Sequence, residues 1–393
     1  MSSALIYKMR LTAPNKPGTA SHNSNYVKYI AEREHVMKLS PESESGLFGR
    51  IDGTNNDELD VTDTQNYVYG ISKAGVTVYN AYISFRPEIA KRLELDSLEK
   101  WQNYIKFHID TLMRGYDIPK DRFEYIAAVH DKKGQPHIHI SFWDKDPPLT
   151  VQFVKKEVSD NVRKKLIHDT FANELSYYYG ISNEAMSDAK ELVGKLMIDF
   201  ERDISGIYSN RFSGVDIPEE LIQKYTDVLN NLPGRGRIAY AYLPKETKDM
   251  VIGMIKEMIM LPKMKSIIND YYSGARSAAE MFDSKETDNG KSEIDRKMRK
   301  AAGDLYNRLG NIILKSMLRT LKENNEQRKK DNAEINTKIT VDSMVYALNA
   351  VSRLFRTQGS AGTVNTAHAL IGELSKQAKK DIARQKQDKG YEV

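Results

Sequence analysis

The segment AAVHDKKGQPHIHISFWD, residues 127–144, constrains the fold of this chain more than any other. Polar and apolar residues alternate in HIHISF, so His137 and His139 point to one face of a strand and the isoleucines between and after them point to the other. If residues 133 and 134 form a two-residue turn, His130 lies directly across from His137. The segment therefore predicts a β-hairpin with three imidazoles on one face.

Three neutral imidazoles on one face suit a divalent cation and leave coordination positions open for water or substrate. Without a cation, the same rings repel one another whenever they are protonated. The alternative is a group of surface histidines, or a hydrogen-bonded pair beside a core, without a ligand role. We interpret His130, His137 and His139 as a metal site.

The amino-acid composition limits which catalytic and metal-binding groups the chain can use. The chain has 393 residues, of which 40% are hydrophobic, and it contains no cysteine. Disulfides, thiolate metal sites and thiol nucleophiles are therefore excluded. The length favours two or three domains. We expect a cytoplasmic protein, because the sequence shows neither an apolar membrane span nor a secretory signal. No Walker A loop is found, so no nucleotide cofactor is expected.

The first 147 residues predict a mixed α/β region. Strands are expected at 4–13, 76–85 and 123–130 and in HIHISF, helices at 24–36 and 97–115, and a loop at 40–63. Ser24 is the expected N-cap of the first helix. The balance of lysine and arginine against aspartate and glutamate is −1 here and +6 in residues 148–393, so a polyanion gains more from the second half.

Long helical patterns follow Pro147. They predict helices at 151–180, ended by Gly180, and at 184–205, 218–231, 245–273, 291–323 and 341–356. The short IAYAYL, residues 238–243, is the one later strand signal. The two halves together predict an α+β protein with an antiparallel sheet and a largely helical C-terminal region.

Tyr26 and Tyr29 are three residues apart and therefore share one side of the first predicted helix. They are explained equally well by packing against the sheet or by nucleophilic catalysis. A tyrosine beside a metal can attack a phosphodiester and hold the cut strand as a phosphotyrosine.

The order of these motifs resembles a known family. An N-terminal strand, a helix with YVKYIAER, GLFG at residues 46–49 and the histidine hairpin are similar to relaxases of the MobL type, in the MobP class of HUH nucleases. The similarity continues into FANEL and LPGRGRIAYAYLPKE and covers residues 1 to 280. It implies an HUH relaxase domain at 1–212 and a helical region at 213–393 that binds DNA or partner proteins.

The resemblance also implies an activity. Such enzymes nick one DNA strand at an origin of transfer through a 5′-phosphotyrosine and can rejoin it, which mobilises a plasmid or an integrative element. The nucleophile of a YI.R-like motif matches Tyr29, and Tyr26 is the alternative. The family's metal ligands match His130, His137 and His139, with Mn or Mg as the implied divalent ion. Trp143 stands where MobP relatives often have asparagine.

The implied partners are single-stranded DNA at the origin of transfer, relaxosome accessory proteins and a coupling protein. Candidate stacking residues are Trp101, Tyr104, Trp143 and the SYYYG run, and candidate phosphate ligands are Arg235, Arg237, Lys155, Lys156, Lys164 and Lys165. His22 and His35 flank the tyrosine helix. Three other classes stay open: a rolling-circle replication initiator, a three-histidine metal-dependent hydrolase and a non-catalytic binding protein.

Overall fold

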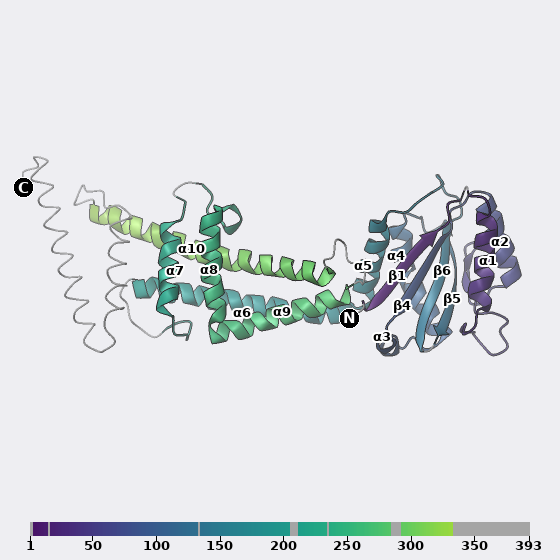
Figure 1. Cartoon of the computed structure of the whole chain (residues 1–393), viewed down its shortest axis with the longest axis horizontal. Coiled ribbons are helices and arrows are strands. Elements are labelled where there is room, and N and C mark those ends of the chain that lie inside the picture. Colours follow the sequence, from purple (N-terminus) through teal and green to yellow (C-terminus); the bar gives the residue numbers. More distant parts are fainter. Residues whose placement is uncertain are drawn as a thin grey trace, which may run out of the picture. The chain divides into compact units, whose positions relative to one another are not determined.

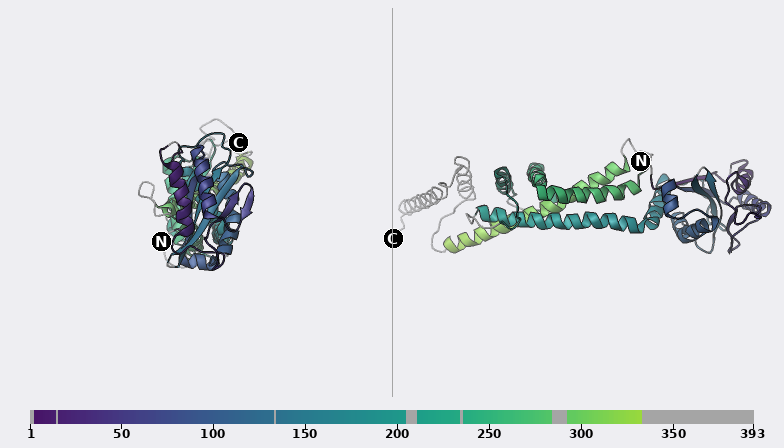
Figure 2. Two further views of the ribbon diagram at one scale, coloured as in Figure 1. Left: turned by 90° about the vertical axis from the view of Figure 1, so that its right-hand side faces the viewer. Right: turned by 90° about the horizontal axis from the view of Figure 1, so that it is seen from below.

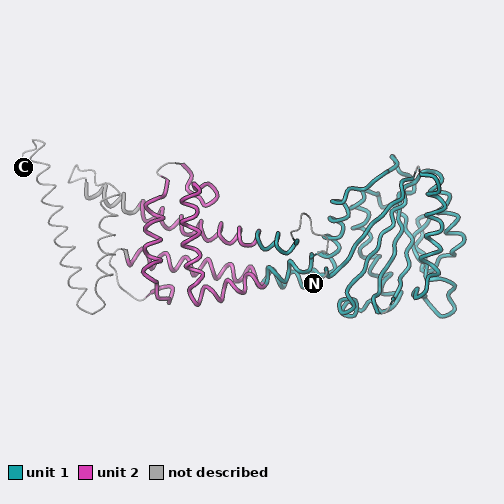
Figure 3. The backbone as a smooth tube through the Cα atoms, viewed as in Figure 1, with its two compact units in different colours: residues 1–180, 274–299 teal, residues 181–273, 300–393 magenta. Residues whose placement is uncertain are grey.

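The computed structural model describes residues 3–14, 16–132, 134–204, 211–233, 236–283 and 292–332. Two compact units divide the chain (Figure 3). The first comprises residues 1–180 and 274–299, and the second comprises residues 181–273 and 300–393. The first unit contains the sheet, and the described part of the second is helical.

A six-stranded antiparallel sheet forms the centre of the first unit. Its strands, in spatial order, are β1 (Leu5–Leu11), β4 (Tyr79–Phe85), β6 (Gln135–Asp144), β5 (Phe123–Lys132), β2 (Phe48–Ile51) and β3 (Thr54–Asn56). Every neighbouring pair is antiparallel. Because the second unit is helical, the predicted α+β class is confirmed.

Helices cover the sheet on both faces (Figures 1 and 2). One layer contains α1 (Thr19–Glu32) and α2 (Val61–Lys73); the other contains α3 (Pro87–Arg92), α4 (Leu98–Gly115) and α5 (Lys156–Thr170). Strand alternation assigns residues to two cores. Ile138, Ile140 and Phe142 of β6 pack toward α4 and α5, whereas Trp143 and Ile126 belong to the cluster beneath α1 and α2.

The hairpin between β5 and β6 has the predicted register. Lys132 pairs with Gln135, and His130 lies opposite His137. Gly134 has a φ of 71°, a left-handed conformation that glycine adopts without the steric cost of a Cβ atom. Two residues therefore separate the paired strands, as the sequence analysis assumed.

Two predictions about this unit are wrong. Helix α1 begins at Thr19 after Gly18 rather than at an N-cap Ser24, because Gly18, with a φ of 82°, turns the chain into the helix earlier. Residues 40–63 are not a plain loop: they contain β2, β3 and the start of α2, which Asp60 caps by accepting a hydrogen bond from the Asp63 amide. The two short strands pair with each other, and β2 also pairs with β5, so tertiary pairing outweighs the polar composition of this segment.

The second unit is built from long helices. Its elements include parts of α6 (Ala172–Ile204), α9 (Pro262–Met281) and α10 (Glu293–Asn332), together with α7 (Glu219–Asn230), α8 (Lys245–Met260) and the short 3-10 turn Tyr240–Tyr242. Leucine, isoleucine and methionine side chains dominate its core. No helix in the described ranges combines the length and apolarity needed to cross a bilayer.

Several predictions about the helical half are wrong. The predicted helix at 151–180 is two helices, because α5 ends at Thr170 and α6 begins at Ala172. Helix α6 continues through Gly180, because buried leucines and methionines further along it outweigh the modest cost of an internal glycine. The pattern at 245–273 is two helices that break at Leu261, since Pro262 suits a first helical position but not an interior one. IAYAYL contains the 3-10 turn instead of a strand. The predicted helix at 341–356 lies outside the described residues.

Candidate active site

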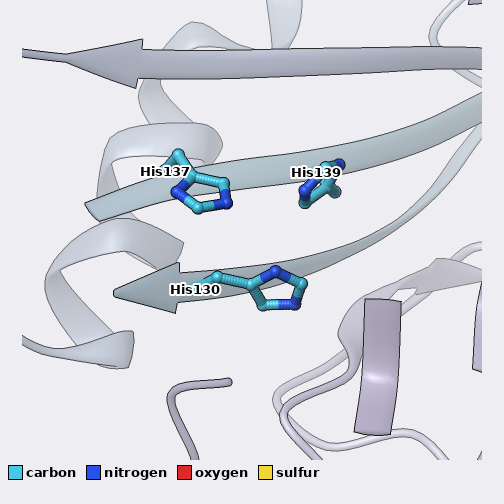
Figure 4. A group of neighbouring side chains, drawn as sticks. All are labelled: His130, His137 and His139. Carbon is cyan, nitrogen blue, oxygen red and sulfur yellow. The ribbon is translucent and has the colours of Figure 1, made fainter. Parts of the chain in front are cut away.

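The three histidines lie together on the sheet face beneath α1. His130 comes from β5, and His137 and His139 come from the neighbouring strand β6. One ring nitrogen from each residue lies within 4.8 Å of the corresponding nitrogens of the other two (Figure 4). The distance between ring centroids is 5.0 to 5.4 Å for each pair. The hairpin register thus brings together all three residues that the spacing suggested.

Backbone carbonyls set the tautomers of two of the rings. His130 donates from Nε2 to the Ile30 carbonyl oxygen of α1 at 2.8 Å, which leaves its Nδ1 lone pair free. His137 donates from Nδ1 to the Gln135 carbonyl oxygen at 3.0 Å, which leaves its Nε2 lone pair free. Metal-binding histidines commonly hold their second nitrogen in this way.

His139 provides the clearest test of whether the cluster fits a metal ion. Its Nδ1 is hydrogen-bonded to the Tyr26 hydroxyl at 2.8 Å. Its Nε2 is buried and has no hydrogen-bond partner among the described residues. A buried polar nitrogen without a partner is costly, and a cation on this nitrogen removes that cost. The donor set therefore fits a divalent metal ion.

The electrostatics of the cluster keep the rings neutral. Burial lowers the pKa of His139 to about 3, with further lowering by His130, His137 and Arg33. Burial also lowers the pKa of His130 and of His137. Neutral imidazole is the form that binds metals, so the three side chains are ready to act as ligands at neutral pH.

Tyr26 and Tyr29 have different environments although their rings stack with centroids 5.8 Å apart. Tyr26 points to His139, and burial, reinforced by Tyr29, raises the pKa of Tyr26 to about 12. Tyr29 is 45% exposed. Its hydroxyl accepts a hydrogen bond from the Arg33 guanidinium, whose central carbon lies 4.9 Å from the centre of the Tyr29 ring. The exposed phenol therefore combines access to solvent with a neighbouring positive charge.

Tyr82 is a site residue that the sequence analysis missed. It lies opposite His139 on β4, and its ring is 5.1 Å from that of His137 and 5.3 Å from that of His139. The signal was present in the alternation of residues 79–85, but it needs the strand order, because β4 is far from β6 in the sequence.

Several candidates for DNA contact are wrong. Trp101 and Trp143 are fully buried and cannot stack on a base. Trp143 instead donates from Nε1 to the buried carboxylate of Glu124 at 3.0 Å, which also accepts from the Tyr67 hydroxyl at 2.7 Å. Tyr104 is partly buried against the first core. Tyrosine remains exposed in the SYYYG run, where Tyr177 is 67% exposed.

The other predicted positions contribute less to the site. His22 lies on the exposed side of α1, and His35 adopts a φ of 71° in the turn after the helix, where its carbonyl accepts a hydrogen bond from the Asp131 amide. Arg237 lies over the ring of Tyr242 in the second unit, at 5.2 Å from the ring centre. Arg235 lies outside the described residues.

One comparison with known proteins assigns the chain to a family. A family model described as MobL relaxases matches residues 6–363. Neither the curated proteins nor the solved structures contain a match to this chain.

Proposed function

Because this chain belongs to the MobL relaxase family and is therefore a DNA relaxase, we propose that it nicks one strand at an origin of transfer by a metal-dependent transesterification. The HUH assignment is supported by His137 and His139, which flank an isoleucine on β6. In this proposal the chain is an HUH nuclease of the MobP class. Its product holds the cut strand as a 5′-phosphotyrosine.

One observation carries the metal dependence. The Nε2 atom of His139 is buried and unpartnered among the described residues, and one ring nitrogen of each of the three histidines lies within 4.8 Å of the other two. A divalent ion, for which Mn or Mg is proposed, polarises the scissile phosphate when it is bound by these three nitrogens. The histidine side chains supply neutral ligands from two rigid, paired strands, so little reorganisation is needed to hold the ion.

We assign the nucleophile to Tyr29. Its hydroxyl is exposed and accepts a hydrogen bond from Arg33. Its oxygen forms a bond to phosphorus, the bond from phosphorus to the 3′ oxygen breaks, the phenolic proton passes to water and the 3′ oxygen takes up a proton. One phosphoester replaces another, so the 3′-hydroxyl can reverse the reaction. Arg33 stabilises negative charge on the phenol and on the phosphate in this step.

Tyr26 has a different role. Its hydroxyl bonds to His139, and burial, the largest cause, raises its pKa to about 12. As the acceptor for the Nδ1 proton, it would leave the Nε2 lone pair of His139 available to a metal ion. Tyr26 is therefore the positioning residue of a ligand, and Tyr29 is the attacking group.

The proposal extends to the cellular context. The reaction takes place on plasmid or integrative-element DNA in the cytoplasm, in a relaxosome with accessory proteins and a coupling protein. Residues 1–212 form the nicking domain, and residues 213–393 bind DNA or partner proteins.

Covalent capture tests this function. The full-length chain is incubated with Mn²⁺ and single-stranded oligonucleotides that tile the DNA around its own gene, and the tyrosine-linked peptide is identified by mass spectrometry. We expect an adduct on Tyr29 that is absent without the metal and in Tyr29→Phe. A replication initiator instead cuts a replication-origin hairpin. A hydrolase forms no adduct, and either result would contradict the proposal.

A further inference from the structure

The sheet face that holds the histidines continues past them onto β4 and β1. The strand registers place Lys8, Tyr82 and His139 in one row across the sheet, and Arg10 opposite Asn80 in the next row. Directly opposed residues of antiparallel strands point to the same face. We refer to Lys8, Arg10, Asn80 and Tyr82 as the β1–β4 strip. With strands about 4.8 Å apart, Lys8 is about 10 Å across the sheet from His139.

The β1–β4 strip is open and positively charged. Lys8 and Arg10 are exposed, whereas Leu5 and Tyr7 on the other face of β1 are buried in the core. Within the described residues, neither Lys8 nor Arg10 forms an ion pair with a carboxylate. Lys8 lies in the same cross-strand row as His139, so this positive charge lies two strands from the histidine cluster.

In the other direction along this face, from the histidines toward β5, helix α1 covers the sheet. Val27 and Ile30 of α1 are buried in the same cluster as Ile126 and Ala128 of β5. A polymer with one phosphate at the histidines cannot continue over β5 beneath this helix. Toward β4 and β1, Asn80 and Tyr82 are half-buried and Lys8 and Arg10 are exposed, so this is the side on which a chain of phosphates meets cations.

We infer that the β1–β4 strip binds the unpaired DNA segment next to the scissile phosphate. Lys8 and Arg10 contact successive phosphates, and the half-buried ring of Tyr82 lies under a base. This inference rests on the proposed function, because that function places the scissile phosphate at the histidines. Single-stranded DNA fits better than an acidic peptide, because Tyr82 of the strip lies directly opposite His139, where the proposed function places the scissile phosphate.

Salt dependence of binding tests the strip. Affinity of the full-length chain for a fluorescein-labelled oligothymidylate is measured by anisotropy over a range of salt concentrations. Loss of one phosphate contact reduces the magnitude of the slope of log K against log[salt] by about 0.7 for a single strand. We expect this reduction in Lys8→Gln and in Arg10→Gln, and about 1.4 in the double variant. Lys120→Gln, at an exposed position in the loop before β5, is the matched control with an unchanged slope.

The outcomes separate the inference from the function on which it rests. If the slopes of both variants equal that of the unchanged chain, the strip does not bind DNA and the inference is overturned, even when the Tyr29 adduct forms. If no adduct forms but the slopes change as expected, the nicking mechanism fails and the DNA surface stands. Competition by an acidic peptide that depends on Lys8 and Arg10, without any change in DNA slope, would assign the surface to a protein.

Discussion

The hydrogen bond between Tyr26 and His139 leads to a specific prediction about metal affinity. Tyr26→Phe removes only the hydroxyl that lies 2.8 Å from His139 Nδ1. The ring then loses the partner that holds its tautomer and orientation. Loss of such an outer partner costs about 10- to 100-fold in metal affinity, or about 1.4 to 2.7 kcal/mol. We expect this weakening for Mn²⁺ in isothermal titration calorimetry of the full-length chain.

Tyr29→Phe is the matched control, because it deletes the same atom from a ring stacked on Tyr26. It should bind Mn²⁺ with unchanged affinity and form no covalent DNA adduct. Tyr26→Phe should show the opposite pattern, with an adduct on Tyr29 restored at saturating metal. The reasoning is refuted if Tyr26→Phe binds Mn²⁺ as tightly as the unchanged chain, or if the adduct maps to residue 26.

Three further predictions concern charge and burial in the first unit. Arg33→Gln should lower the rate of adduct formation on the order of 100-fold at saturating metal while calorimetry shows the same metal affinity, because it removes a donor to the reacting oxygen; an unchanged rate contradicts this role. Glu124→Ala should lower the free energy of unfolding by about 3 kcal/mol, since it leaves the Trp143 and Tyr67 donors without their acceptor. Tyr67→Phe should cost less, about 1.5 kcal/mol. Burial lowers the pKa of His108 to about 4, against about 6.5 in the unfolded chain. The unfolded chain therefore binds more protons between these values, and the free energy of unfolding should fall by about 3 kcal/mol at most as the pH drops from 6.5 to 4. In His108→Gln, the free energy of unfolding should depend less on pH over this range. An equal pH dependence in this variant and in the unchanged chain would contradict the role given to His108. Urea unfolding monitored by tryptophan fluorescence measures the free energy of unfolding of Glu124→Ala, Tyr67→Phe and His108→Gln, because both tryptophans lie in the first unit.

Local patterns predicted much of this fold because they depend on neighbours in the sequence. The alternation in HIHISF placed His130 opposite His137 on the assumption of a two-residue turn, and the observed register confirms that assumption. The 3.6-residue period likewise predicted α4, which begins after the cap residue Ser97. Helix boundaries were less predictable where local sequence preference and tertiary packing favour different outcomes. Gly180 stays inside α6, and Pro262 divides a continuous apolar pattern, because packing and proline geometry decide there.

The sequence by itself determined that no thiol takes part, and it predicted that two tyrosines share one helix side and, given a two-residue turn, that three imidazoles share one strand pair. Only the tertiary structure decided which tyrosine faces which group. Helix α1 packs on β5 so that Tyr26 reaches His139 while Tyr29 stays exposed beside Arg33. Tertiary structure also decided that β4 lies beside β6, which brings Tyr82 next to the histidines, and that Trp143 is an internal donor to Glu124. The physical reason is that strand order and the rotation of a packed helix depend on contacts between residues far apart in the chain, which no local period encodes.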